Sequence, residues 1–135
     1  MKKSALIFLL LFPLAVAYGP SVWAQNDVEI EGLIIDQTRS KMGHDFYQEF
    51  VNSWEEPPGI KAYNIVIGEQ NDPRLGNWAV LEIGDSVYRA LLKPREEDIA
   101  QAASEAIAAT RDYLLNLAEY EKSLEEKDMK GKGIY

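Results

Sequence analysis

The single histidine of the chain, His44, lies in the segment SKMGHDFYQEF among residues that could support catalysis. In a hydrolytic interpretation, His44 would be the general base and Asp45 or Glu49 would orient it. Ser40 or Ser53 would then be the nucleophile. On a helix, however, neighbouring side chains point about 100 degrees apart, so His44 and Asp45 could not form a local pair. Ser40 and His44 would share a face, but no glycine-lined turn offers an oxyanion site. We therefore predict a structural role for this segment and no catalytic residue.

Metal and nucleotide sites have little support in the sequence. One histidine and no cysteine leave only carboxylates as ligands, and no segment has the D-x-[DN]-x-[DN]-G spacing of a calcium loop. The acidic clusters at 55–56, 96–98 and 125–128 are typical of helix ends and solvated faces. No glycine-rich phosphate loop follows a strand-like segment. We expect neither a metal nor a cofactor.

A contact site is indicated at the turn NDPRLGNW, where Arg74, Leu75 and Trp78 lie on or beside an exposed tip. In the simplest interpretation, Trp78 folds inward and the turn is only a connection. Alternatively, an arginine next to apolar side chains is typical of residues that anchor protein interfaces. We predict Arg74, Leu75 and Trp78 as contacts for a substrate or partner.

The first residues have the pattern of a secretory signal peptide, with two lysines, an apolar run from Ala5 to about Ala17 and small residues up to Ala24. Removal of residues 1–24 would leave 111 residues with 12 basic and 22 acidic side chains, a net charge of −10. This charge opposes binding to nucleic acid. The apolar run is shorter than the roughly 20 residues of a membrane-spanning helix, so we expect an exported protein without a membrane anchor. Since there is no cysteine, burial and self-association must supply the stability that disulfides often give exported proteins.

Apolar residues recur at helical spacing from about Arg39 to Trp54, and the prolines of EEPPG at 55–59 end this pattern. Asp36 or Thr38 is expected to cap the start of this helix. The residues expected to face the core are Met42, Phe46 and Phe50.

Three strand-like segments follow at 60–68, 77–83 and 86–92, each with alternating apolar residues. Gly84-Asp85 fits a tight hairpin turn, which makes the three segments an antiparallel meander. A second helix is predicted from about Arg95 to Lys122, because good helix formers dominate this stretch.

This order predicts one α+β domain over residues 25–127, followed by a flexible C-terminal tail at 128–135. Its parts are an N-terminal helix, an antiparallel β-meander of three to four strands, and a long C-terminal helix packed on the sheet.

The segment GLIIDQTRSKMGHDFYQEFVNSWE resembles the signature of the CsgE family of curli assembly and secretion accessory proteins. That signature runs G-L, D-x-T, G-H-D-F-Y, F and W-E. In this chain it falls on Gly32, Leu33, Asp36, Thr38, Gly43, His44, Asp45, Phe46, Tyr47, Phe50, Trp54 and Glu55. The similarity continues through RLGNW, which is close to the family's R-x-G-x-W. The chain differs from the enteric members at Leu75, where they have an aromatic residue, and at Ser104 and Glu105, where they have bulkier apolar ones.

The resemblance implies a non-enzymatic role in the periplasm. Family members form ring-like homo-oligomers, nonameric in the family, that cap the inner mouth of the outer-membrane curli secretion channel. They direct unfolded amyloid subunits into this channel and prevent premature fibre assembly. The expected partners are therefore a CsgG-like channel, CsgA/CsgB-like amyloid subunits and further copies of the chain. Two alternatives stay open: a small periplasmic hydrolase or ligand-binding protein that uses His44 and Glu49, and an α+β partner module of another export system.

Overall fold

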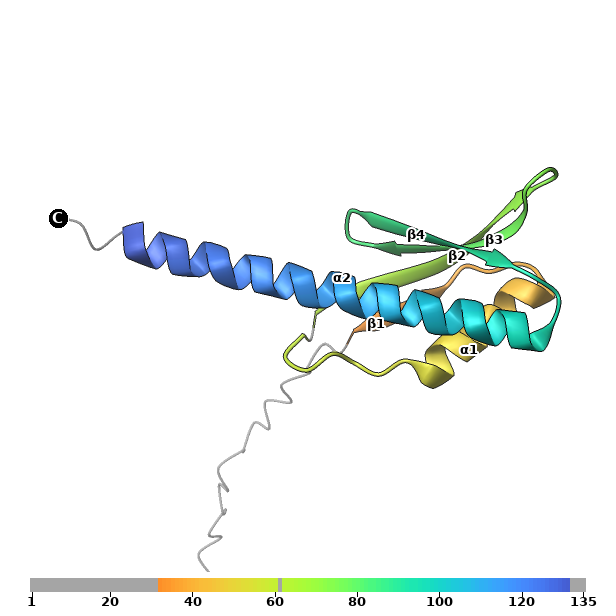
Figure 1. The fold of residues 1–135 in the computed structure, drawn as a ribbon, viewed down its shortest axis with the longest axis horizontal. Coiled ribbons are helices and arrows are strands. Elements are labelled where there is room, and N and C mark those ends of the chain that lie inside the picture. The colour runs from red at the N-terminus through yellow and green to blue at the C-terminus, as the bar shows by residue number, and fades with distance from the viewer. Residues whose placement is uncertain (1–31, 61, 132–135) are drawn as a thin grey trace, which may run out of the picture.

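The computed structural model describes residues 32–60 and 62–131, which form a four-stranded sheet and two helices (Figure 1). In chain order the elements are β1 (Leu33–Asp36), α1 (Lys41–Ser53), β2 (Asn64–Asp72), β3 (Gly76–Ile83), β4 (Ser86–Leu92) and α2 (Glu96–Gly131). The helix expected from about Arg39 to Trp54 corresponds to α1. The expected signal peptide and its cleavage site lie outside the described residues.

The sheet has the order β1-β2-β3-β4 and is mixed. β2 with β3 and β3 with β4 are antiparallel pairs, but β1 runs parallel to β2, with Ile34 opposite Ile65. The prediction of an antiparallel sheet is therefore wrong at this edge. Parallel neighbours need a long crossover connection, and α1 with its flanking loops supplies it.

Both helices cover one face of the sheet, and the core lies between the helices and that face. Alternate strand residues point to opposite faces of a sheet, and only one of the two sets is buried. The buried strand residues are Ile65, Ile67, Ala79, Leu81, Ile83, Ala90 and Leu92, and those from the helices are Phe46, Phe50, Ile99, Ala103, Ala106, Thr110 and Leu114. Met42, which was also expected to face the core, is half-buried and packs against this cluster.

Helix α2 is longer than predicted from the sequence. It continues past Lys122, the expected end, to Gly131. Its last buried residue is Leu114, and the C-terminal part projects beyond the sheet (Figure 1). Residues 128–131 of the expected tail are helical, and 132–135 lie outside the described residues. Within the described ranges, neither helix is apolar enough over a sufficient length to cross a membrane.

Candidate functional site

The first turn of α1 is held by one residue of its own segment and one residue of β2. The N-cap is Ser40, whose Oγ accepts a hydrogen bond from the Gly43 N–H at 3.0 Å. A carboxylate oxygen of Glu69 accepts hydrogen bonds from the N–H groups of Arg39 and Ser40 and from the Ser40 hydroxyl, at 3.2, 3.1 and 2.9 Å. Glu69 thus places a negative charge at the positive end of the helix dipole. No sequence signal linked this glutamate to α1, because 29 residues separate it from Ser40.

Asp36 does not cap α1 as predicted, and neither does Thr38. Asp36 instead accepts hydrogen bonds from the Thr38 N–H and hydroxyl, at 2.8 and 2.6 Å, in a turn that leads into the helix. The other Asp36 oxygen lies 3.1 Å from Nδ1 of His44. Partial burial alone would raise the pKa of Asp36, but the hydrogen bonds from Thr38 and the contact with His44 lower it below its ordinary value. His44 therefore ties the helix to the end of β1.

The catalytic arrangement considered for this segment is not assembled in the structure. Glu49 lines a shallow hollow with Lys41 and Asp45, and His44 is not part of its lining. Asp45 pairs with Lys41 at 2.6 Å on the surface of α1, and the Ser40 hydroxyl is engaged by Glu69. The geometry does not support the hydrolase alternative.

An aromatic ladder runs along the buried side of α1. Ring centroids are 6.4 Å apart for Phe46 and Phe50, and 5.4 Å apart for Phe50 and Trp54, whose rings are stacked. Trp54 meets Tyr63 edge-on at 5.9 Å, and its Nε1–H donates a hydrogen bond to the Tyr63 hydroxyl at 2.9 Å. The ladder joins α1 to the segment that enters β2. Tyr47, the remaining aromatic residue of the signature, stacks with the ring of His44, and the two ring centroids are 6.1 Å apart.

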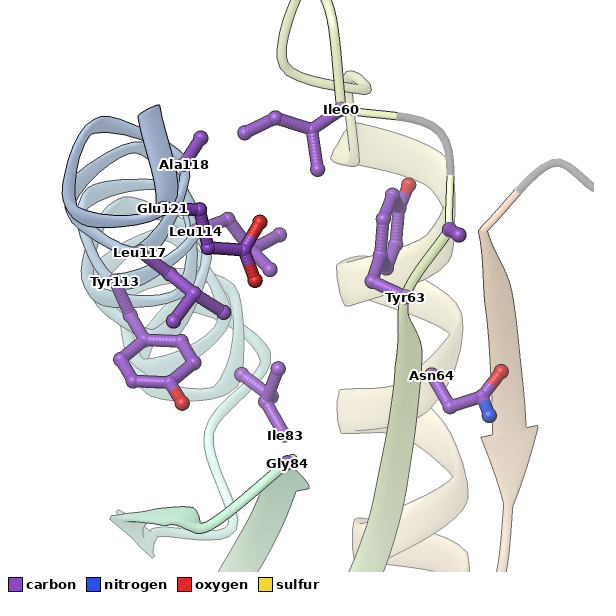
Figure 2. A pocket seen from close by; sticks show the side chains of 11 residues that line it. Ile60, Tyr63, Asn64, Ile83, Gly84, Tyr113, Leu114, Leu117, Ala118 and Glu121 are labelled. Atoms are coloured by element: carbon purple, nitrogen blue, oxygen red, sulfur yellow. The ribbon is translucent and has the colours of Figure 1, made fainter. Parts of the chain in front are cut away.

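Tyr63 also borders an apolar groove of about 430 Å³, shown in Figure 2. One side of the groove comes from the segment before β2 and from the β3–β4 turn, and the other from α2. The lining includes Ile60, Tyr63, Ile83, Leu114, Leu117 and Glu121. Among the described residues that line the groove, Glu121 is the one carboxylate, and most of the others are apolar. The groove combines residues from distant parts of the chain, which explains why sequence patterns did not indicate it.

The predicted contact residues are at the opposite end of the sheet, at the β2–β3 turn (Figure 1). Asp72 shapes this turn, since its Oδ1 accepts hydrogen bonds from the N–H groups of Arg74 and Leu75 at 2.8 and 3.1 Å. Gly76 follows with a φ of 93°, a conformation that favours glycine. Leu75 is 66% exposed, so an apolar side chain stands at the tip beside the exposed Arg74.

Trp78 is half-buried and lies on the face of the sheet that carries no helix, so the interpretation that it folds inward is wrong. It borders a hollow of about 240 Å³ together with Leu75 and Arg89, and Arg74 is outside this lining. The structure therefore brings Leu75 and Trp78 together and adds Arg89 to them. The register of the β3–β4 hairpin indicates this addition, because Trp78 is opposite Leu91 and Arg89 is two residues along β4.

Comparisons with known proteins agree with the signature in the first half of the chain. A family profile described as "Curli assembly protein CsgE" matches residues 30–132. The "Curli production assembly/transport component CsgE" of Salmonella typhi is 30% identical over 113 residues, covering 83% of this chain and 84% of that protein. The proteins of the same name from Escherichia coli O6:H1 and O157:H7 are each 32% identical over 89 residues, covering 65% of this chain and 67% of theirs. The chain therefore belongs to the CsgE family of curli assembly proteins.

Proposed function

We propose that this chain is a periplasmic accessory protein for the secretion of curli-type amyloid. It caps the outer-membrane secretion channel, directs unfolded amyloid subunits to it, and prevents premature fibre assembly. The observation that carries the proposal is the family match over residues 30–132, which contains every helix and strand of the domain. The relatives are named as assembly or transport components of curli production, and that role is extended here to this chain.

The signature residues make contacts that hold the fold together, which supports a protein that acts by binding. Ser40, Gly43 and Asp36 take part in the start of α1, and His44 binds Asp36. The aromatic residues of α1 form the ladder between the helix and the start of β2. These side chains maintain the domain, so its function would lie in its exposed surfaces.

Two exposed surfaces at opposite ends of the sheet support assembly into a ring. One is the tip of the β2–β3 hairpin with Arg74 and Leu75, and the other is the projecting part of α2, where Tyr120 is 60% exposed and Leu124 42% exposed. Contacts between two different surfaces of identical chains form closed rings when the rotation between neighbours closes. We assign Arg74, Leu75 and Trp78 to contact with the substrate or a partner.

Such a ring would act through confinement and separation. Holding an unfolded subunit in a closed space lowers its conformational entropy and thereby favours its exit through the channel. Keeping subunits apart also prevents their segments from stacking into cross-β structure. Neither effect needs a catalytic residue or a cofactor.

The test uses the full exported chain with a recombinant curli-type amyloid subunit freshly transferred out of denaturant. We expect a longer lag in amyloid-dye fluorescence at well below equal stoichiometry, ring-shaped particles by electron microscopy, and recovery of the curli channel from outer-membrane extract. An unchanged lag would refute the chaperone activity, and recovery of a different export channel would place the chain in another system.

A variant pair localises the contact. Leu75→Ser should weaken the delay or the ring, while Leu33→Ser, on β1 at a similarly exposed position, should leave both unchanged. Equal behaviour of the two variants would contradict the assignment of the hairpin tip.

A further inference from the structure

Strand β4 is an open edge of the sheet. It pairs with β3 on one side, and within residues 32–60 and 62–131 no strand pairs with it on the other. The seven residues Ser86–Leu92 include neither proline nor glycine, and Arg89 is their single charge. Proteins usually protect such edges by shortening, bulges, proline or several charges. The other edge, β1, is only four residues long.

The backbone groups on the open side can be assigned from the hairpin geometry. Gly84-Asp85 is a two-residue turn between β3 and β4, and Ile83 is opposite Ser86. In a hairpin of this kind the flanking residues form a hydrogen-bonded pair, and the direction of the backbone groups then alternates. Ser86, Tyr88, Ala90 and Leu92 therefore point their N–H and C=O groups toward β3. Those of Val87, Arg89 and Leu91 point outward.

A groove of about 290 Å³ runs beside this edge, between β4 and the first turns of α2. The α2 side contributes the carboxylates of Asp98 and Glu105, whereas Arg89 and Lys93 line the β4 side. Glu105 also accepts a hydrogen bond from Gln101 at 3.0 Å. The pKa of Tyr88 is raised, first by burial and then by the negative charge of Glu105. On its α2 side, an added strand would thus lie next to an acidic wall formed by Asp98 and Glu105.

We propose that the β4 edge and this groove bind an extended segment of an unfolded export client as a fifth strand of the sheet, with lysine or arginine side chains on the side that faces α2. The inference rests on the proposed function, which supplies a client without secondary structure. Main-chain hydrogen bonds to an open edge provide affinity for an extended peptide, and pockets for alternate side chains provide selectivity. A client segment paired in this way is not available to template another subunit.

The side chains of β4 favour a foreign segment over a second copy of the chain. Antiparallel self-pairing over the full length of Ser86–Leu92 would place Arg89 directly opposite Arg89. Like charges at directly opposite positions destabilise a strand pair. A client segment can instead place lysine or arginine toward Asp98 and Glu105 and an uncharged or acidic residue opposite Arg89.

Amide hydrogen exchange measured by NMR tests the pairing directly. The probe is the same amyloid subunit, freshly transferred out of denaturant and added to the full exported chain. We expect the protection of the Val87, Arg89 and Leu91 amides to rise more than about tenfold, because they gain partners in the bound client. The Tyr88 and Ala90 amides already face β3 and should change little.

Three outcomes overturn the proposal. If the chain delays fibre growth of the client but amides 87, 89 and 91 stay unchanged, the edge is not the binding site and the proposed function stands. If protection appears without client and rises with protein concentration, a second copy occupies the edge. If the client neither binds nor shows delayed fibre growth, the proposed function fails together with this inference.

A charge-reversal pair tests the acidic wall. Glu105→Lys should weaken client binding about fivefold, while Glu119→Lys makes the same charge change at an exposed position further along α2 and should have little effect. Equal losses in the two variants would show a general effect of net charge, and the groove would then not be the site.

Discussion

The carboxylate of Glu69 fills the space in which a Cβ atom on Gly43 would lie. Residue 43 is in the first turn of α1, and Glu69 is on β2. The missing side chain lets a carboxylate from the sheet reach the N–H groups at the start of the helix. The glycine of the signature is therefore explained by its contact with β2.

Gly43→Ala is expected to destabilise the domain by about 1 kcal/mol, although alanine is intrinsically the better helix former. The added methyl group would displace Glu69 and leave the N–H groups of Arg39 and Ser40 without their charged acceptor, which costs more than the gain in propensity. Urea denaturation followed by circular dichroism measures the free energy of unfolding.

Glu69→Ala supplies the control for this prediction. In that background the space beside residue 43 is empty, so Gly43→Ala should be neutral or stabilising by up to about 1 kcal/mol. A stabilising effect of Gly43→Ala in the unmodified chain would contradict the proposed steric conflict.

Phe50 is the centre of the aromatic ladder, in contact with both Phe46 and Trp54. Phe50→Ala should lower the free energy of unfolding by about 3–5 kcal/mol, since it removes a fully buried ring and leaves a cavity. Val51→Ala, at the next and partly exposed position of α1, should change it by less than about 0.5 kcal/mol. Similar losses for the two variants would mean that the ladder does not hold α1 in place.

Local patterns were sufficient for most elements of the fold. The spacing of apolar residues indicated α2, and the turn Gly84-Asp85 placed the β3–β4 hairpin, whose strand β4 has the predicted bounds 86–92. β1 was missed because a four-residue strand has too few residues for a clear alternation. The extension of α2 to Gly131 was missed because its charged end has no apolar face to bury.

The candidate site could be predicted only where it depends on neighbours in sequence. The turn motif correctly placed Arg74 and Leu75 at an exposed tip, because Asp72 and Gly76 determine a local geometry. The roles of Glu69 and Arg89 depend on the pairing of separate strands. Such contacts have no local sequence signal, and they require the register of the sheet.

Thr110 carries a buried polar group without a partner. Its hydroxyl is the one buried side-chain polar group without a hydrogen-bond partner in the described part of the chain, and the residue is 1% exposed. Thr110→Val has nearly the same shape and a similar helix propensity, and it removes the hydroxyl. We therefore expect the free energy of unfolding to rise by about 1 kcal/mol.

Thr38→Val is the matched control for Thr110→Val. Its hydroxyl is bonded to Asp36 at 2.6 Å, so the same change there should destabilise the domain. Loss of stability in Thr110→Val would mean that the hydroxyl has a partner in solution, such as a buried water molecule.

Asp36 makes the free energy of unfolding of the domain depend on pH in the acidic range. Its pKa is lowered in the folded chain, because the hydrogen bonds from Thr38 and the contact with His44 outweigh the opposing effect of burial. A carboxyl group with a lowered folded pKa stabilises the fold fully above its ordinary value of 3.8, and this contribution is lost as the pH falls below it. Asp36→Asn should therefore be less stable than the unmodified chain at pH 7, by up to about 1 kcal/mol.

The difference between Asp36→Asn and the unmodified chain should shrink when urea denaturation is repeated at pH 3. The exposed control Glu119→Gln should differ little from the unmodified chain at pH 7. A deficit for Asp36→Asn of the same size at both pH values would show that the charge of Asp36 is not what stabilises the turn, and that the geometry of its hydrogen bonds suffices.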